Sequence, residues 1–178
     1  MTITWRSFLL RPNPEDRDPD EFTAYTTHWA RPAGMEPRAR FTTPWTGDNP
    51  PPSHSLPAAV ASKVVMHHFP AGFDEFHHRL MDAYFAENRT ISEPSVLTDL
   101  ATEAGLDGAA FADRYQEEWK PWARAAYDDH NLAVNSGING VPAVVVADRY
   151  LVSGAVPVDD YRAVLARVRE ERTGGHGT

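Results

Sequence analysis

The first residues of the chain alternate in a way that is typical of a β-strand. Within Thr2–Leu10, the large apolar residues Ile3, Trp5 and Leu9 all fall on odd positions. Side chains two residues apart share one face of an extended strand, and Ile, Trp, Phe and Thr favour strands. The pattern therefore predicts a strand over Thr2–Leu10, and the prolines of Arg11–Pro14 end it.

Prolines are frequent in the segment that follows, which predicts short or irregular elements. Asp18 is followed directly by a proline, the order of an N-cap and a first helical residue. We therefore expect a short helix over Pro19–Trp29. Pro32–Pro52 is predicted to be a long ordered loop, held against the body of the protein by Phe41 and Trp45.

A series of amphipathic helices is predicted through residues 53–136, because apolar residues recur there every three or four positions. Ser92 and Asp107 are expected to cap the starts of two helices, and Gly105 and Gly137 to follow the ends of two others. The most apolar stripe consists of Phe73, Phe76, Leu80, Tyr84 and Phe85.

The C-terminal part predicts a β-hairpin and then a helix. Ala143–Ala147 is a short, Val-rich run of the kind found in buried strands. Residues 148–149 make a tight turn, and Tyr150–Ser153 returns as the second strand. A terminal helix follows Pro157, and the tail at residues 173–178 is expected to be disordered. Strand, helices, hairpin and helix in this order indicate an α/β domain with a mostly helical insertion.

Composition and charge exclude several classes of function. The 178 residues carry a net charge of −8, whereas a protein that neutralises phosphates presents a basic face, so we expect no nucleic-acid partner. No apolar run approaches the roughly 20 residues of a membrane span. No secretory signal follows Met1. We therefore expect a cytoplasmic protein without a membrane partner.

The chain contains no cysteine. It can therefore form no disulfide, no thiolate metal site and no thiol nucleophile of its own. Histidine pairs at residues 67–68 and 77–78 invite a metal hypothesis, but neighbouring histidines on a helix point about 100° apart and do not chelate. We expect solvated or capping histidines, no metal site and no cofactor.

Three further groups were weighed for chemistry. His54 and Ser55 stand at a predicted helix start, where they could bind an anion or simply cap the helix. Residues 128–129, two aspartates before a histidine, could form an acid–base group, but a solvated helix face explains them better. Trp119 and Trp122 are expected to pack in the core or an interface.

Three segments in order resemble one known family. Gly137–Pro157, containing the sequence GINGVPAVVV, is similar to the closing segment of DsbA-family thioredoxin-fold proteins. Tyr84–Asp107, with the sequence EAGLD at its end, resembles the helical insertion of the FrnE-like branch. Ile3–Pro12 resembles the second strand of that branch and the loop after it.

The resemblance implies an α/β, thioredoxin-like fold of the DsbA type with a large helical insertion. It implies a single domain over residues 1–178, with residues 53–136 inserted. It also implies a cis bond before Pro142, which would leave the backbone of Val141 free to pair with an extended substrate. On this basis Val141, Pro142, His54 and Ser55 are the expected substrate-binding residues.

The chain departs from the family in one respect. The family's first strand, its Cys-x-x-Cys pair and the start of its active-site helix have no counterpart in this sequence. The two strands that flank that first strand would then face a gap, and three arrangements would fill it. A segment upstream of Met1 would supply the strand, a second or swapped copy would supply it, or Thr2–Leu10 would pair directly with Ala143–Ala147.

The resemblance implies protein disulfide oxidoreductase or isomerase activity for the family. A chain without a thiolate is expected to be inactive in disulfide exchange. Two alternatives stay open: a non-redox binding module for an extended peptide or an apolar small molecule, and an enzyme similar to the chromene-carboxylate isomerases. We expect a peptide or small-molecule substrate, and a homodimer or strand-sharing partner.

Overall fold

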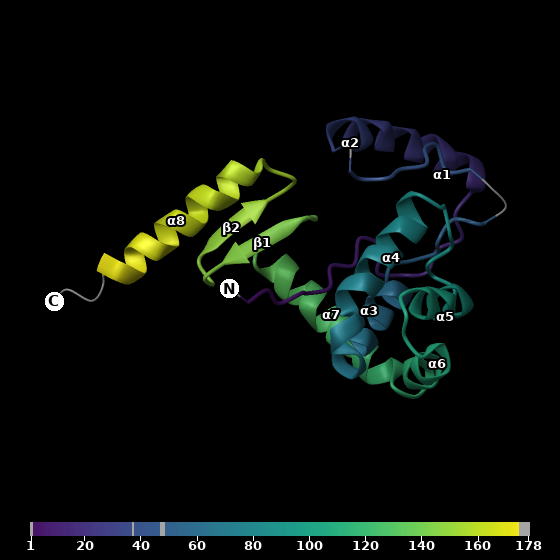
Figure 1. Cartoon of the computed structure of the whole chain (residues 1–178). Helices are drawn as coiled ribbons and strands as arrows, with labels where there is room; N and C mark the ends of the chain where they lie inside the picture. Colours follow the sequence, from purple (N-terminus) through teal and green to yellow (C-terminus); the bar gives the residue numbers. More distant parts are fainter. Residues whose placement is uncertain (1, 37, 47–48, 175–178) are drawn as a thin grey trace. The chain divides into compact units, whose positions relative to one another are not determined.

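The computed structural model describes residues 2–36, 38–46 and 49–174. They fall into two compact units, residues 1–130 and 131–178, and each is described by itself (Figure 1). Within the described ranges, no helix combines the length and apolar character needed to cross a membrane.

The first unit is built from helices and irregular segments (Figure 1). Its N-terminal helices are α1 (Pro19–Thr26), η1 (Thr27–Trp29) and α2 (Ala30–Met35). The larger group comprises α3 (Leu56–His68), η2 (Pro70–Gly72), α4 (Phe73–Phe85), α5 (Pro94–Glu103), α6 (Gly108–Glu117) and the greater part of α7 (Trp119–Asn135).

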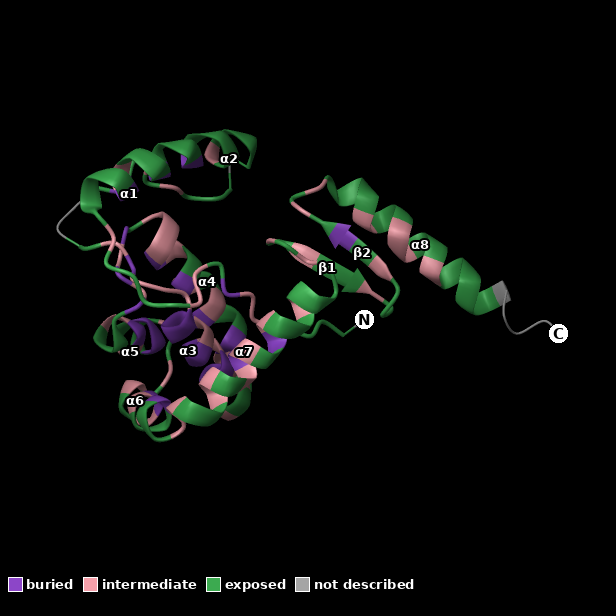
Figure 2. Ribbon diagram, turned by 180° about the vertical axis from the view of Figure 1, so that it is seen from behind, coloured by how far each residue is buried: buried purple, intermediate pink, exposed green. Residues whose placement is uncertain are grey.

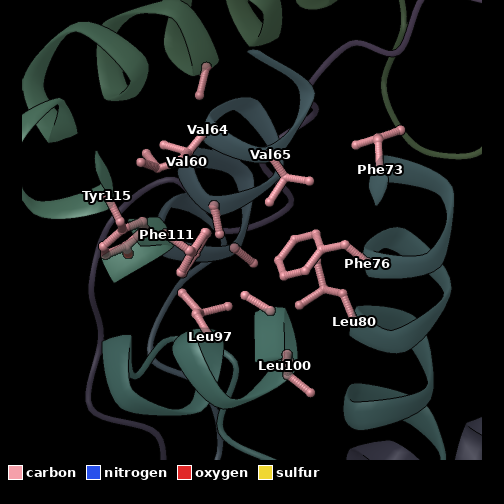
Figure 3. Close-up of a cluster of buried hydrophobic side chains, with 14 of the residues drawn as sticks. Val60, Val64, Val65, Phe73, Phe76, Leu80, Leu97, Leu100, Phe111 and Tyr115 are labelled. Carbon is pink, nitrogen blue, oxygen red and sulfur yellow. The ribbon is translucent and has the colours of Figure 1, made fainter. Parts of the chain in front are cut away.

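The main core lies among helices α3 to α6, where buried residues are concentrated (Figure 2). Figure 3 shows the valines of α3 facing the aromatic rings of α4 and α6 and the leucines of α5. The fully buried side chains at its centre include Val60, Val64, Val65, Phe76, Leu97, Leu100 and Phe111. The predicted amphipathic helices therefore pack their apolar faces on one another.

A second, aromatic cluster anchors the proline-rich segment. Phe22, Trp29 and Trp45 are buried together, with Phe41 packed against them. The prediction that Phe41 and Trp45 hold this segment in place is therefore confirmed. The prediction of an uninterrupted loop from Pro32 was wrong, because the helical path continues through α2, whose first turn tolerates a proline that lacks an N–H.

Several local predictions about helix ends are confirmed. The Asp18 carboxylate accepts hydrogen bonds from two backbone N–H groups of α1, and the Asp107 carboxylate accepts one from the N–H of Ala110 in α6. Gly105 has a φ of +80°, and the N–H of Leu106 donates to the carbonyl of Ala101, as in a Schellman motif. Gly137, after α7, also has a positive φ.

The predicted cap at Ser92 was wrong. The residue before α5 is Glu93, and no side chain caps that helix. The Ser92 hydroxyl instead accepts a hydrogen bond from the backbone N–H of Ser53, at 3.1 Å. The hydroxyl oxygen of Ser92, which the local sequence predicted to cap the helix, is therefore engaged in a tertiary contact.

The predicted strand over Thr2–Leu10 is absent. These residues run without regular secondary structure. Among the described residues the sheet consists of β1 and β2 alone, so the direct pairing of Thr2–Leu10 with Ala143–Ala147 is not found. A strand exists only when a neighbouring strand pairs with its backbone. Here the N–H groups of Ser7 and Leu9 donate instead to side chains of α7, those of Asp129 and His130.

The second unit holds a β-hairpin and a helix. Strands β1 (Ala143–Val146) and β2 (Tyr150–Ser153) pair antiparallel, close to the predicted bounds. The prediction that the first of them is a buried strand was wrong, because Val144 and Val145 are exposed. The hydroxyl of Tyr150 donates to Glu171 of α8 (Val158–Gly174), a contact of 2.5 Å that holds helix to hairpin. Because α8 includes residues 173–174, the disordered tail was predicted too early, and residues 175–178 lie outside the described ranges.

Candidate substrate site and family

The Val141–Pro142 segment precedes β1 in the second unit. The peptide bond between the two residues is cis, which agrees with the expectation for Pro142. The carbonyl of Pro142 accepts a hydrogen bond of 2.8 Å from the N–H of Gly154, whose φ of +84° favours glycine. This bond extends the hairpin ladder by one residue and fixes the position of Pro142 relative to β2.

Val141 is the exposed member of this pair. Its side chain is 51% exposed, although it is a large apolar residue. Within the described part of the chain, no hydrogen bond engages its backbone N–H or carbonyl. The residue therefore offers one donor, one acceptor and an apolar side chain to an extended ligand.

His54 and Ser55 lie in the first unit, just before α3. The Ser55 hydroxyl accepts a hydrogen bond from the N–H of Arg11, and the N–H of Ser55 donates to the carbonyl of Arg11. His54 Nδ1 lies 2.9 Å from the hydroxyl of Ser53, and partial burial lowers the pKa of its imidazole. Ser55 thus anchors the N-terminal segment, and His54 precedes it.

Sequence reasoning missed a buried charged cluster. The Asp129 carboxylate accepts hydrogen bonds from Lys63 Nζ at 2.6 Å, Arg6 Nη1 at 2.9 Å and the backbone N–H of Ser7 at 3.0 Å. The prediction of a solvated helix face was wrong for Asp129, whose side chain is only 8% exposed. The feature of the sequence that could have indicated this cluster is Lys63, a single lysine inside the apolar run of α3.

The electrostatics of this cluster favour a charged carboxylate. Burial by itself would raise the pKa of Asp129. The hydrogen bonds from Lys63, Ser7 and Arg6 outweigh burial and hold the pKa of Asp129 below its ordinary value. The cluster is therefore an ion pair that ties the N-terminal segment to α3 and α7.

The paired histidines are more involved in packing than predicted. His68 Nε2 lies 2.9 Å from Glu118 Oε2, and this contact lowers the pKa of Glu118. The His77 ring lies 4.6 Å from the ring of Trp5, and burial lowers the pKa of His77. Among the described residues, no group of three or more side chains is placed to hold a metal ion.

Trp119 and Trp122 pack against the main core, as predicted. The indole N–H of Trp122 also donates to Glu118, at 3.0 Å.

The family model described as "DSBA-like thioredoxin domain" matches residues 49–166, most of the chain. The chain belongs to this family. The match includes α3 to α7 and the hairpin, so the fold is α/β and thioredoxin-like with a large helical part, as predicted.

Relatives of this DSBA-like domain cover nearly all of it. "Uncharacterized protein YwbO" of Bacillus subtilis (strain 168) is 24% identical over 179 residues, which is 97% of this chain and 84% of that protein. A solved structure described as a putative protein disulfide isomerase from Nitrosomonas europaea matches with a TM-score of 0.73. That match has 19% identity and covers 93% of this chain and 79% of the other.

A second solved structure is similar in fold. The cytosolic disulfide reductase DsbM from Pseudomonas aeruginosa matches with a TM-score of 0.66 and 23% identity, covering 88% of this chain and 81% of that one. The same reductase has been solved with GSH. At these identities the likeness shows the fold.

Proposed function

We propose that this DSBA-like domain binds an extended peptide or small molecule along the backbone of Val141 and performs no thiol–disulfide exchange of its own. The observation that supports the proposal is the exposed Val141, with its N–H and carbonyl unpaired in the described part of the chain. Backbone groups of this kind pair with an extended ligand by adding it as a short strand.

The proposed lack of exchange chemistry follows from the residues present. Thiol–disulfide exchange begins when a thiolate attacks a disulfide sulfur. The 178 residues contain no cysteine, and the sulfur of methionine is a thioether that cannot supply a thiolate. The domain would therefore bind a substrate and leave its sulfur atoms unchanged.

The neighbouring structures suggest a class of ligand. The Pseudomonas reductase was solved with GSH, a short thiol peptide, and it is named as cytosolic. We propose a ligand of this size and extended shape, a cytoplasmic location and membership of the FrnE-like branch. Pro142 would shape the site next to Val141, and His54 with Ser55 would contribute only through the N-terminal segment that they hold.

Binding of glutathione tests the proposal. Titration calorimetry would compare glutathione with its thiol-free analogue, in which 2-aminobutyrate replaces cysteine. We expect similar affinities, because backbone pairing needs no sulfur. Val141→Pro removes the backbone N–H and should weaken the binding of both ligands by about tenfold. This corresponds to the loss of one hydrogen bond, at roughly 1–1.5 kcal/mol. Val141→Ala keeps the N–H and serves as the matched control.

Insulin reduction tests the absence of exchange chemistry. With dithiothreitol present, the chain should not accelerate insulin precipitation beyond the rate of the reagent alone. Catalytic turnover would contradict this part of the proposal. The proposal of ligand binding would be contradicted if neither glutathione nor its analogue binds and the Val141 amide resonance does not move in NMR spectra.

A further inference from the structure

The N-terminal segment has one occupied backbone edge. The N–H groups of Ser7 and Leu9 donate to the side chains of Asp129 and His130. The N–H of Arg11 donates to the hydroxyl of Ser55. These donors lie two residues apart, which is the spacing at which an extended chain presents groups on the same edge.

The other edge of this segment is open. Its backbone groups belong to the even-numbered residues, Thr4, Arg6, Phe8 and Leu10. Within the described part of the chain, no hydrogen bond engages their N–H or carbonyl groups. The segment therefore presents a row of free donors and acceptors with the period of a strand.

Strand β1 also has an open edge. Because Gly154 donates to Pro142 and Val144 is aligned with Val152, the alternation of an antiparallel pair directs the groups of Val144 and Val146 toward β2. The groups of Ala143 and Val145 then point away from β2. The sheet of the described residues has no third strand to receive them.

Neither edge carries the charged side chains that commonly prevent pairing between molecules. Natural edge strands are protected by charged side chains, prolines or bulges. The one proline near the β1 edge, Pro142, directs its carbonyl to the N–H of Gly154 and so lies off the open edge. Residues 138–147 contain no charged residue, and residues 2–10 contain only Arg6, which is paired with Asp129. In a chain of net charge −8, two segments without acidic residues add no repulsion between two copies.

We propose that two copies of this chain exchange strands, with residues 4–10 of one copy pairing with β1 of the other. A single sequence carries both open edges, so a two-fold exchange pairs the β1 edge of each copy with part of the N-terminal row of the other and forms a closed dimer. Ala143 and Val145 supply the pairing groups of β1. Val141, at the end of the same edge, stays available for the proposed ligand.

Single cysteine variants test this arrangement directly, because the natural chain has none. Thr4→Cys and Val145→Cys chains would be mixed and oxidised mildly. We expect a disulfide-linked species containing one chain of each type. Asp99→Cys and Asp159→Cys replace exposed acidic residues of α5 and α8, which belong to neither edge. That matched pair should give no such product.

Mass in solution provides the second readout. Sedimentation should give twice the mass of one chain. Val145 is 52% exposed, and Val145→Lys places a charge beside the open edge and should return the mass to that of one chain. Val158→Lys, at an exposed valine of α8, should leave the dimer intact. Circular dichroism would confirm that both variants keep their fold.

Two results would overturn the proposal. One is a natural chain that sediments as a monomer. The other is a Thr4→Cys/Val145→Cys double variant that forms its disulfide within a single chain. The Val145→Lys variant separates this proposal from the proposed function. Val141 is unchanged in that variant, so glutathione should still bind to it although the dimer is lost.

Discussion

Lys63 Nζ lies 2.6 Å from Asp129 Oδ2, and both side chains are more than nine-tenths buried. Lys63 is on α3 and Asp129 on α7, so the pair joins two helices across the first unit. The N–H of Ser7 donates to the same carboxylate oxygen and ties the N-terminal segment to both. Three parts of the chain distant in sequence therefore depend on one ion pair.

Removing the lysine should be strongly destabilising. Lys63→Met leaves the Asp129 carboxylate buried without its closest cation, which typically costs about 3–5 kcal/mol of unfolding free energy. Urea unfolding followed by circular dichroism measures this loss. Arg6→Ala, which removes the largely exposed partner of the same carboxylate, should cost no more than about 1 kcal/mol. Equal losses for the two variants would contradict the assignment.

The Asp129 carboxylate should make the free energy of unfolding depend on pH. Its pKa is lower in the folded chain than in the unfolded chain, so the unfolded chain takes up the proton first as the pH falls. The stabilisation is complete at neutral pH and is lost as the pH drops below about 4. Urea midpoints should fall more steeply with acid in the natural chain than in Asp129→Asn. Parallel curves would show that Asp129 is not the titrating group.

The aromatic cluster should hold the segment around Trp45. This side chain is 4% exposed, and its backbone N–H donates to the hydroxyl of Thr26 at 2.6 Å. Trp45→Ala should cost about 3–5 kcal/mol and make residues 38–46 sensitive to protease. Trp5→Ala removes a half-exposed ring that contacts His77 and should cost about 1 kcal/mol. Limited proteolysis with mass spectrometry distinguishes the two.

Substitution by alanine should change the stability of the fold in opposite directions at two glycines. Gly105 has a φ of +80°, so Gly105→Ala should destabilise the chain by about 1–2 kcal/mol even though open space surrounds it. Gly34 lies in α2 with no atom near an added methyl group, and Gly34→Ala should stabilise by about 0.5–1 kcal/mol. Thermal unfolding measures both, and a shared sign would contradict the backbone argument.

The sequence predicted the features that depend on neighbours along the chain. The caps at Asp18 and Asp107, the glycine at Gly105 and the bounds of Tyr150–Ser153 were all found where expected. Each depends on hydrogen bonds or backbone angles within a few residues, so the local residue types are sufficient to specify it.

The sequence also determined the family, since the thioredoxin-like pattern is contained in the order of residues, and the same order shows 178 residues without a cysteine. Only the tertiary structure decided that Thr2–Leu10 is not a strand and that Asp129 is buried. Both outcomes depend on which distant group meets a backbone N–H or a carboxylate. An alternating pattern or an aspartate on a helix does not contain that information, because the partner comes from another part of the fold.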